Sequence, residues 1–211
     1  MSLYVYAVVN RAPSGLKGLH GEPLTAVDLD GAFVVVGAIE GAPELAVSAL
    51  RAHDEAVRRI ADAVDAILPA RFGSLVDDES ALRAALQPRR SELLEALRLV
   101  AGCAQMTLRV FLDSPRQPPP AQSGTEYLTQ RLQARRLPEL DSARAQLGNL
   151  VRGERIETHD TAPLVATVHH LIRRENAQAY LDAIKRADSG ELRLVPSGPA
   201  PPYAFAPEAV K

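Results

Sequence analysis

A proline-rich stretch at residues 114–124, SPRQPPPAQSG, interrupts this 211-residue chain near its middle. Proline fixes φ and has no amide donor, so such a stretch is typical of an extended surface connection rather than of a helix or a central strand. The segments on either side are each roughly 100 residues long, which is enough to bury a hydrophobic core. We therefore predict a first domain at residues 1–113, a linker at 114–123 and a second domain at 124–211.

The first domain begins with patterns typical of antiparallel strands. Residues 3–9 are rich in Val and Tyr and are followed by turn-forming residues, which indicates a strand. Residues 24–30 and 33–39 flank Asp30-Gly31, a dipeptide that suits the positive φ angles of a two-residue hairpin turn. We expect these two segments to form an antiparallel hairpin.

Two helices and two further strand segments are expected in the rest of this domain. One helix follows Pro43 and ends before Leu68, and a second opens at Pro88. Residues 67–76 contain a proline and a glycine and suggest a broken or edge strand, whereas strict alternation over residues 106–112 predicts a regular strand. The apolar residues assigned to the two helices are Leu50, Val57, Ile60 and Val64, and then Leu93, Leu97 and Val100.

The second domain is expected to combine strands and helices in a small sheet. Apolar residues between positions 127 and 150 predict two helices, or one helix kinked at Pro138. Residues 164–172 and 191–195 predict strands on either side of an amphipathic helix at 176–187. This succession indicates a ferredoxin-like sheet. We therefore predict an α+β fold of two small domains, the second ferredoxin-like and the first a variant α+β sheet with helices on one face.

Charge and hydropathy argue against two classes of protein. The net charge of −2 and the pI near 6.2 are unlike those of a nucleic-acid-binding surface, which needs a basic excess to neutralise phosphates. No apolar stretch approaches the roughly 18 residues that a membrane-spanning helix needs. The N-terminus has no basic leader. We expect a cytoplasmic protein that neither binds nucleic acid nor is integral to a membrane.

Sequence motifs that carry a catalytic mechanism are absent from the chain, including phosphate loops, dinucleotide-binding fingerprints, HExxH and GxSxG. Cys103 is the single cysteine, which rules out an intrachain disulfide and predicts a small buried thiol. His169 and His170 are neighbours on a strand, so they point to opposite faces and cannot chelate one ion together. His53 lies on the apolar stripe of its helix, as a core or interface histidine does. We predict a protein that is not an enzyme and has no catalytic residue, metal or cofactor.

Three segments spread over nearly the whole chain carry a family resemblance. The first is the strand at residues 3–9. The second runs from His53-Asp54-Glu55 to ILPARFGSL at 67–75, and the third is GPAPPYAF at 198–205. In this order they resemble the first strand, the acidic helix with its leucine-proline-x-arginine-phenylalanine-glycine element, and the proline-rich ending of the GvpF/GvpL family of gas vesicle synthesis proteins. Ala200 stands where that family usually has tryptophan, which removes an aromatic anchor from the tail.

The resemblance implies a role in gas vesicle assembly or structure. The implied location is the cytoplasm and the gas vesicle, and the implied partners are the hydrophobic gas vesicle shell protein and other gas vesicle accessory proteins. The residues themselves leave a second possibility open, a ferredoxin-like ligand-binding or regulatory module unrelated to gas vesicles.

Arg71 and Phe72 are candidates for partner binding. They lie between a proline and a glycine, where a restricted backbone would present a planar cation and an aromatic ring, residue types that often dominate interfaces. The alternative is that Phe72 packs in the first core and that Arg71 pairs with a helix carboxylate such as Asp62 or Asp65.

Tyr203 and Phe205 in the C-terminal tail are the other two candidates. The prolines before them restrict the chain to extended backbone and leave few amide donors. Such a segment becomes ordered by laying side chains on a surface, so we expect both rings to dock on the folded body.

Overall fold

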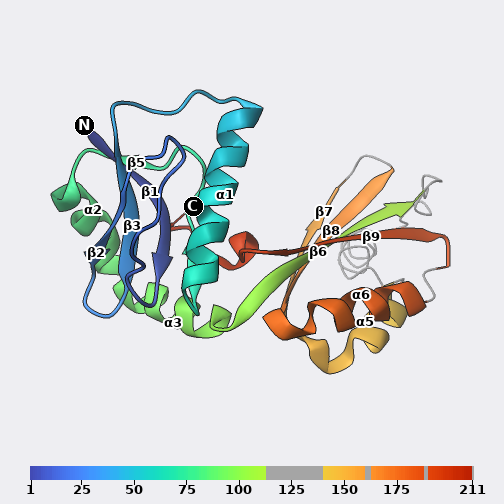
Figure 1. Cartoon of the computed structure of the whole chain (residues 1–211). Helices are drawn as coiled ribbons and strands as arrows, with labels where there is room; N and C mark the ends of the chain where they lie inside the picture. Colours follow the sequence, from blue (N-terminus) through green and yellow to red (C-terminus); the bar gives the residue numbers. More distant parts are fainter. Residues whose placement is uncertain (113–139, 160–162, 188–189, 211) are drawn as a thin grey trace, which may run out of the picture. The chain divides into compact units, whose positions relative to one another are not determined.

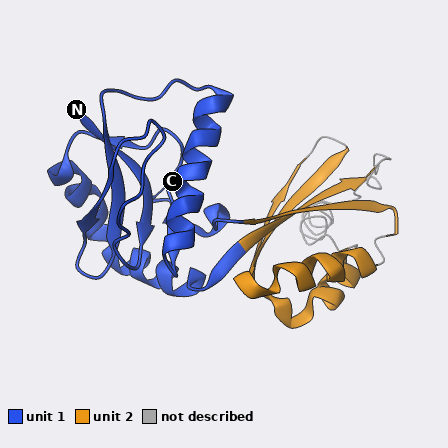
Figure 2. Cartoon of the chain, viewed as in Figure 1, with its two compact units in different colours: residues 1–104, 200–211 blue, residues 105–199 orange. Residues whose placement is uncertain are grey.

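The chain forms two compact units, which Figure 2 distinguishes by colour. A computed structural model describes residues 1–112, 140–159, 163–187 and 190–210. Unit 1 consists of Met1–Ala104 together with Ala200–Lys211, and unit 2 consists of Gln105–Pro199. The chain therefore has two domains, as predicted, but unit 2 is inserted between two segments of unit 1.

The extents of the units differ from the predicted domains at 1–113 and 124–211. The strand β6, Cys103–Leu112, starts in unit 1 and continues into unit 2, so the first unit ends at Ala104. The tail returns to unit 1 because its apolar residues are buried there: Pro201, Pro202, Phe205, Ala206 and Val210. The predicted linker at 114–123 lies outside the described residues.

Unit 1 is built on an antiparallel sheet of five strands (Figure 1). Their order is β2-β3-β1-β4, and β5 also pairs with β1. The strands are β1 at Ser2–Val9, β2 at Leu24–Asp28, β3 at Phe33–Ile39, β4 at Ile67–Pro69 and β5 at Leu75–Val76. The broken strand predicted at 67–76 is thus confirmed, since β4 and β5 are two short strands that both pair with β1.

The predicted hairpin between β2 and β3 is also confirmed. Its turn residues Asp30 and Gly31 have φ angles of 54° and 109°. The amide of Leu29 donates to the carbonyl of Ala32 over 2.8 Å, which closes a two-residue loop. Positive φ at both central positions is the geometry for which an aspartate-glycine pair is suited.

Three helices cover this sheet: α1 at Val47–Ala63, α2 at Glu79–Leu86 and α3 at Arg90–Val100. α1 lies on one side of the sheet and α2 on the other (Figure 1). Both faces of β3 are accordingly buried, since Val34 and Val35 have no exposed surface. The expected placement of helices on one face is therefore too simple for unit 1, because alternate residues of its central strands are apolar on both faces.

Two details of the helices were not anticipated. α2 was missed as an element of its own, although Asp78 caps it by accepting a hydrogen bond from the amide of Ala81 at 2.8 Å. Leu50 was assigned to the buried stripe of α1, yet it is 41% exposed, because the first turns of this helix have no core beneath them. Leu93, Leu97 and Val100 of α3 are buried as predicted.

Unit 2 has the ferredoxin-like arrangement that was predicted, a four-stranded sheet in the order β7-β8-β6-β9. After β6 come α5 at Asp141–Leu147, β7 at Val151–Thr158, β8 at Leu164–Arg173, α6 at Ala177–Arg186 and β9 at Leu192–Ala200. β7 was missed, because four of its eight residues are charged and it lies at an edge of the sheet. Among the described residues, no helix is long and apolar enough to cross a membrane.

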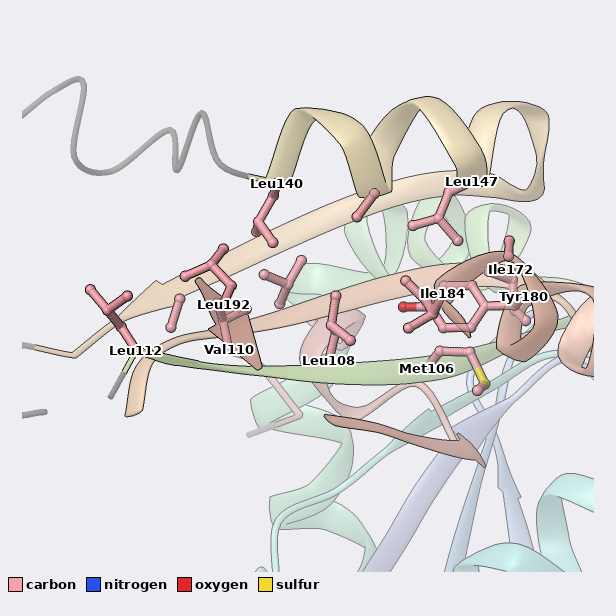
Figure 3. Packing of buried hydrophobic residues seen from close by; sticks show 14 residues of the cluster. Met106, Leu108, Val110, Leu112, Leu140, Leu147, Ile172, Tyr180, Ile184 and Leu192 are labelled. Atoms are coloured by element: carbon pink, nitrogen blue, oxygen red, sulfur yellow. The ribbon is translucent and has the colours of Figure 1, made fainter. Parts of the chain in front are cut away.

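The core of unit 2 lies between the sheet and its helices (Figure 3). Met106, Leu108, Val110 and Leu112 alternate along β6 and enter this core, as the period of two predicted. α5 and α6 add Ala143, Leu147, Tyr180 and Ile184, and Leu140, just before α5, joins them. The residues between them in β6 face the opposite side of the sheet, called the outer face below.

Candidate functional site

The candidate site begins at the turn between β4 and β5, which carries Arg71 and Phe72. Backbone hydrogen bonds of 2.9 Å to β1 fix the turn at both ends, at Ala70 and Ser74. The amide of Ser74 donates to the carbonyl of Arg71 over 3.3 Å, and Gly73 has a φ of 87°. A type II turn needs positive φ at its third residue, which glycine supplies without strain. Phe72 is therefore presented from a fixed backbone.

Phe72 closes a cluster of aromatic rings on the α1 side of the sheet. Its ring makes edge contacts with Tyr4 and His53, at centroid distances of 6.4 and 5.8 Å. The Tyr6 ring stacks on the imidazole of His53 at 5.8 Å and lies 4.8 Å from Tyr4. Because Phe72 is partly exposed, it joins the core of unit 1 on one side and the surface on the other.

His53 is the polar centre of this aromatic cluster and is only 4% exposed. Its Nδ1 is hydrogen-bonded to the Tyr4 hydroxyl at 2.9 Å, and that hydroxyl also accepts a hydrogen bond from the Gly73 amide at 3.0 Å. Nε2 has no hydrogen-bond partner among the described residues. Burial lowers the pKa of His53, while the backbone of Ala70 and the Asp54 carboxylate act in the opposite direction. The imidazole is therefore neutral at pH 7.

The Tyr6 hydroxyl attaches a surface loop to the same cluster. It donates to the Glu22 carboxylate and accepts from the Leu19 amide at 2.8 Å. The other Glu22 oxygen accepts from the His20 amide at 2.9 Å. Burial and the adjoining Glu22 carboxylate raise the pKa of Tyr6 above its usual value. These bonds hold the loop before β2 against the cluster.

The tail docks on the folded body, as predicted, but the surface on which it docks belongs to unit 1 rather than to the second domain. Tyr203 is partly buried against the core of this unit, and its hydroxyl lies 3.5 Å from a carboxylate oxygen of Asp54 on α1. Phe205 is 4% exposed, so it is buried in unit 1 and anchors the tail there. Arg71 lies 4.0 Å from Glu208 of the tail, and both side chains are mostly exposed. The suggested pairing of Arg71 with Asp62 or Asp65 is replaced by this loose contact.

A group of exposed apolar residues at the start of α1 escaped the sequence prediction. Leu45 is 79% exposed, Val47 65% and Leu50 41%. Leu50 and His53 lie one turn apart on the same side of α1, and His53 contacts Phe72. We call Leu45, Val47 and Leu50 the α1 patch. No local pattern reveals this patch, because its exposure depends on where the buried side of α1 begins, at His53.

Unit 2 contains a second buried histidine, His170, which is 2% exposed. Its Nδ1 is hydrogen-bonded to the Tyr180 hydroxyl at 2.7 Å and its Nε2 to Glu154 at 3.0 Å. Glu154 also pairs with Arg144 at 3.3 Å. The hydrogen bond from His170, aided by Arg144, lowers the pKa of Glu154 to about 2 although partial burial opposes the change.

This chain of polar groups resembles a catalytic relay, but its hydroxyl end is closed. Tyr180 has no exposed surface and belongs to the core, so a substrate cannot reach its oxygen. Cys103 is buried, as predicted. His169 points away from His170, as predicted, and contacts Gln105 and Thr107 on the outer face. Among the described residues, no three histidine, cysteine or carboxylate side chains are grouped to hold a metal ion.

Comparisons with known proteins agree over almost the full length of the chain. Residues 2–207 match the family described as gas vesicle synthesis protein GvpL/GvpF. Gas vesicle protein L of Streptomyces sp. (strain CB03234) is 26% identical, over 96% of this chain and 92% of the relative. Gas vesicle protein F of the same strain is 25% identical, over 97% and 99% of the two chains.

Solved structures share the fold. The crystal structure of the gas vesicle protein GvpF from Microcystis aeruginosa has a TM-score of 0.77 at 18% identity, covering 98% of this chain and 99% of that one. The corresponding values for GvpF from Anabaena sp. PCC7120 are 0.75 and 19%, with 98% and 96% covered. With a family match that leaves only a few terminal residues out, the chain belongs to the gas vesicle synthesis protein GvpL/GvpF family.

Proposed function

We propose that this protein is a gas vesicle assembly factor that acts by binding, and that it binds the hydrophobic shell protein directly through unit 1. A shell subunit that builds a water-excluding wall carries apolar surface before it is assembled. A soluble partner must cover that surface, because exposed apolar patches otherwise lead to aggregation. Family membership makes the gas vesicle the setting and leaves the alternative of an unrelated ligand-binding module without support.

The observation that carries the site is the exposed apolar surface at the start of α1. Leu45 and Val47 are 79% and 65% exposed, and burying apolar surface of this kind against a partner is favourable. Leu50 continues the patch toward His53, whose ring touches Phe72. Apolar contact with a partner would remove this surface from water.

The candidate residues of the turn and the tail border this patch. Phe72 contacts His53, and Tyr203 contacts Asp54, which lies one turn beyond Leu50 on α1. Arg71 is exposed beside them and can donate to backbone carbonyls or carboxylates of a partner. Phe205 acts from within unit 1, where it holds the tail in place. We therefore assign contact roles to Arg71, Phe72 and Tyr203 and a supporting role to Phe205.

Co-expression with a tagged shell protein followed by pull-down tests the function and the site separately. The wild-type chain is expected to be recovered with the shell protein. A Leu45→Ser/Val47→Ser variant is expected to lose most of the recovery, and Arg71→Ala and Phe72→Ala to lose part of it. Leu99→Ser is the matched control, since Leu99 is also an exposed apolar residue, at 46%, but lies on α3.

Different results of this experiment would contradict the binding of the shell protein and the location of its binding site. No complex with the wild-type chain would contradict direct binding of the shell protein. A complex that survives all three test variants, or that Leu99→Ser weakens as much, would contradict the site while leaving the binding intact. Thermal unfolding of each variant separates loss of contact from loss of fold, because exposed substitutions usually change stability by less than about 0.5 kcal/mol. Phe72→Ala also removes ring contacts with Tyr4 and His53, so its recovery is compared at a temperature at which it remains folded.

A further inference from the structure

The outer face of the unit 2 sheet is a second surface with a chemistry of its own. Side chains alternate across a strand, and the even-numbered residues of β6 and β8 enter the helix-covered core. Arg109 and Phe111 of β6 therefore face the other way, as does Arg155 of β7, which lies opposite His169 of β8. The contact between His169 and Thr107 places these odd-numbered residues of neighbouring strands on one surface.

This face is basic, whereas the chain as a whole has a net charge of −2. Arg109, Arg155 and Arg193 are all exposed on three different strands, and Arg173 at the end of β8 has the same sign. Among the described strand residues, Glu157 is the carboxylate on this face, two residues along β7 from Arg155. Positive charge gathered on a surface of an acidic protein favours an acidic partner.

Arg193 is held in a geometry suited to binding carboxylates. Its guanidinium lies over the Phe111 ring, 4.2 Å from the ring centroid. Stacking uses the flat face of the guanidinium and leaves its edge, with the N–H donors, free to form paired hydrogen bonds with a carboxylate. Arg109 lies two residues from Phe111 on the same face of β6. The two guanidinium groups can thus bind successive carboxylates of one segment.

We propose that the outer face of unit 2 is a docking surface for an acidic protein segment, whose carboxylates bind Arg109 and Arg193 beside Phe111. A single-stranded nucleic acid is the less suitable ligand. Open sheets of this kind that bind RNA stack two or three bases on aromatic side chains. Phe111 is the one phenylalanine, tyrosine or tryptophan among the described strand residues of this face, and the imidazole of His169 is mostly buried and hydrogen-bonded to Thr107. This surface is separate from the shell-binding site proposed on unit 1.

Titration of the full chain with a short fluorescein-labelled polyglutamate peptide tests the proposal by fluorescence anisotropy. The wild type is expected to bind, with an affinity that falls as salt is raised. Arg109→Gln/Arg193→Gln is expected to weaken binding about tenfold or more, and the lysine versions of the same two positions to weaken it less, because lysine keeps the charge but not the planar fork. Lys185→Gln/Arg186→Gln removes two charges from α6 on the other layer and is expected to change binding less than about twofold.

Three results would overturn this proposal. They are no binding of polyglutamate by the wild type, equal weakening by the α6 control, and tighter binding of a labelled single-stranded oligonucleotide than of the peptide. Circular dichroism and thermal unfolding of the glutamine and lysine variants check that the sheet is intact. The outcome does not depend on the shell-protein pull-down, so the two proposals can fail independently.

Discussion

Each unit of the molecule contains one buried histidine bonded through Nδ1 to a tyrosine hydroxyl, and the two differ in what surrounds the second nitrogen. In unit 1, Nε2 of His53 has no hydrogen-bond partner among the described residues and the ring lies among aromatic rings. In unit 2, Nε2 of His170 binds Glu154, which is paired in turn with Arg144. A histidine–tyrosine pair therefore lies in an apolar cluster in unit 1 and in an ionic network in unit 2.

The difference teaches how each unit uses a buried polar group. The unit 1 cluster is kept neutral, opens to the surface at Phe72 and lies beside the proposed binding surface. The unit 2 network satisfies both ring nitrogens and ends inside the core at Tyr180, which suits a structural role. Changes at the two histidines should accordingly differ in size and in pH dependence.

Removal of the tail is expected to give the largest difference in stability between the two units. A chain that ends at Ala200 lacks Phe205 and Val210, which are buried in unit 1. Loss of this apolar burial should destabilise unit 1 by roughly 5 kcal/mol, while unit 2 keeps its sheet and the His170 network. Hydrogen exchange resolved by unit measures this, with Glu208→Gln as the control, because that side chain is 73% exposed. Equal protection of unit 1 with and without the tail would contradict tail docking.

Replacing each histidine by leucine compares the two centres directly. His170→Leu leaves the buried Tyr180 hydroxyl unpaired and removes a partner of Glu154, so we expect a loss of about 2 to 3 kcal/mol. His53→Leu should cost only about 1 kcal/mol, because the Tyr4 hydroxyl keeps its bond from the Gly73 amide and no other bond is lost. Urea unfolding at pH 7 measures both values. Equal costs, or the reverse order, would show that the second nitrogen does not decide the difference.

The Glu154 carboxylate is expected to make the stability of unit 2 depend on acid pH. Its pKa is lowered from 4.5 to about 2 in the folded chain, so the unfolded chain binds the proton more readily. The resulting stability is complete above pH 4.5 and is lost as the pH falls toward 2. Glu154→Gln should flatten this part of the stability curve. Glu157→Gln, a change on the same strand at a 66% exposed side chain, should leave it as in the wild type.

The smallest expected effect is the titration of His53. Because burial lowers its pKa, the imidazole should take up a proton only below pH 6.5, and the stability that it contributes above pH 6.5 should be lost as the pH falls through the lowered pKa. Imidazole resonances followed by NMR measure this, with His53→Gln to assign the signal. A midpoint above 6.5 would mean that the aromatic cluster holds a charged histidine.

The local patterns of the chain allowed much of the fold to be predicted. Alternation placed residues 106–112 with the correct face toward the core, and Asp30-Gly31 identified the hairpin. β7 was missed because an edge strand needs few apolar residues and carries charges instead. The return of residues 200–211 to unit 1 was also missed, because a contact that spans the whole inserted unit leaves no local pattern.

The candidate site was predictable only in part, for the same physical reason. The turn at Phe72 and the buried position of His53 follow from nearby residues, a glycine in one case and a helical stripe in the other. The partner of Arg71 comes from the tail, and the exposure of Leu50 depends on where the sheet beneath α1 ends. Both depend on tertiary placement rather than on spacing along the chain.

The most direct test of the central claim is the solubility of the shell protein when it is co-expressed with this chain. The account predicts that the wild type raises the soluble fraction of the shell protein and co-purifies with it. Leu45→Ser/Val47→Ser should raise that fraction far less, and the Leu99→Ser control should act as the wild type does. An unchanged soluble fraction with the wild-type chain, measured after centrifugation of the lysate, would contradict the claim that this protein covers the apolar surface of the shell subunit.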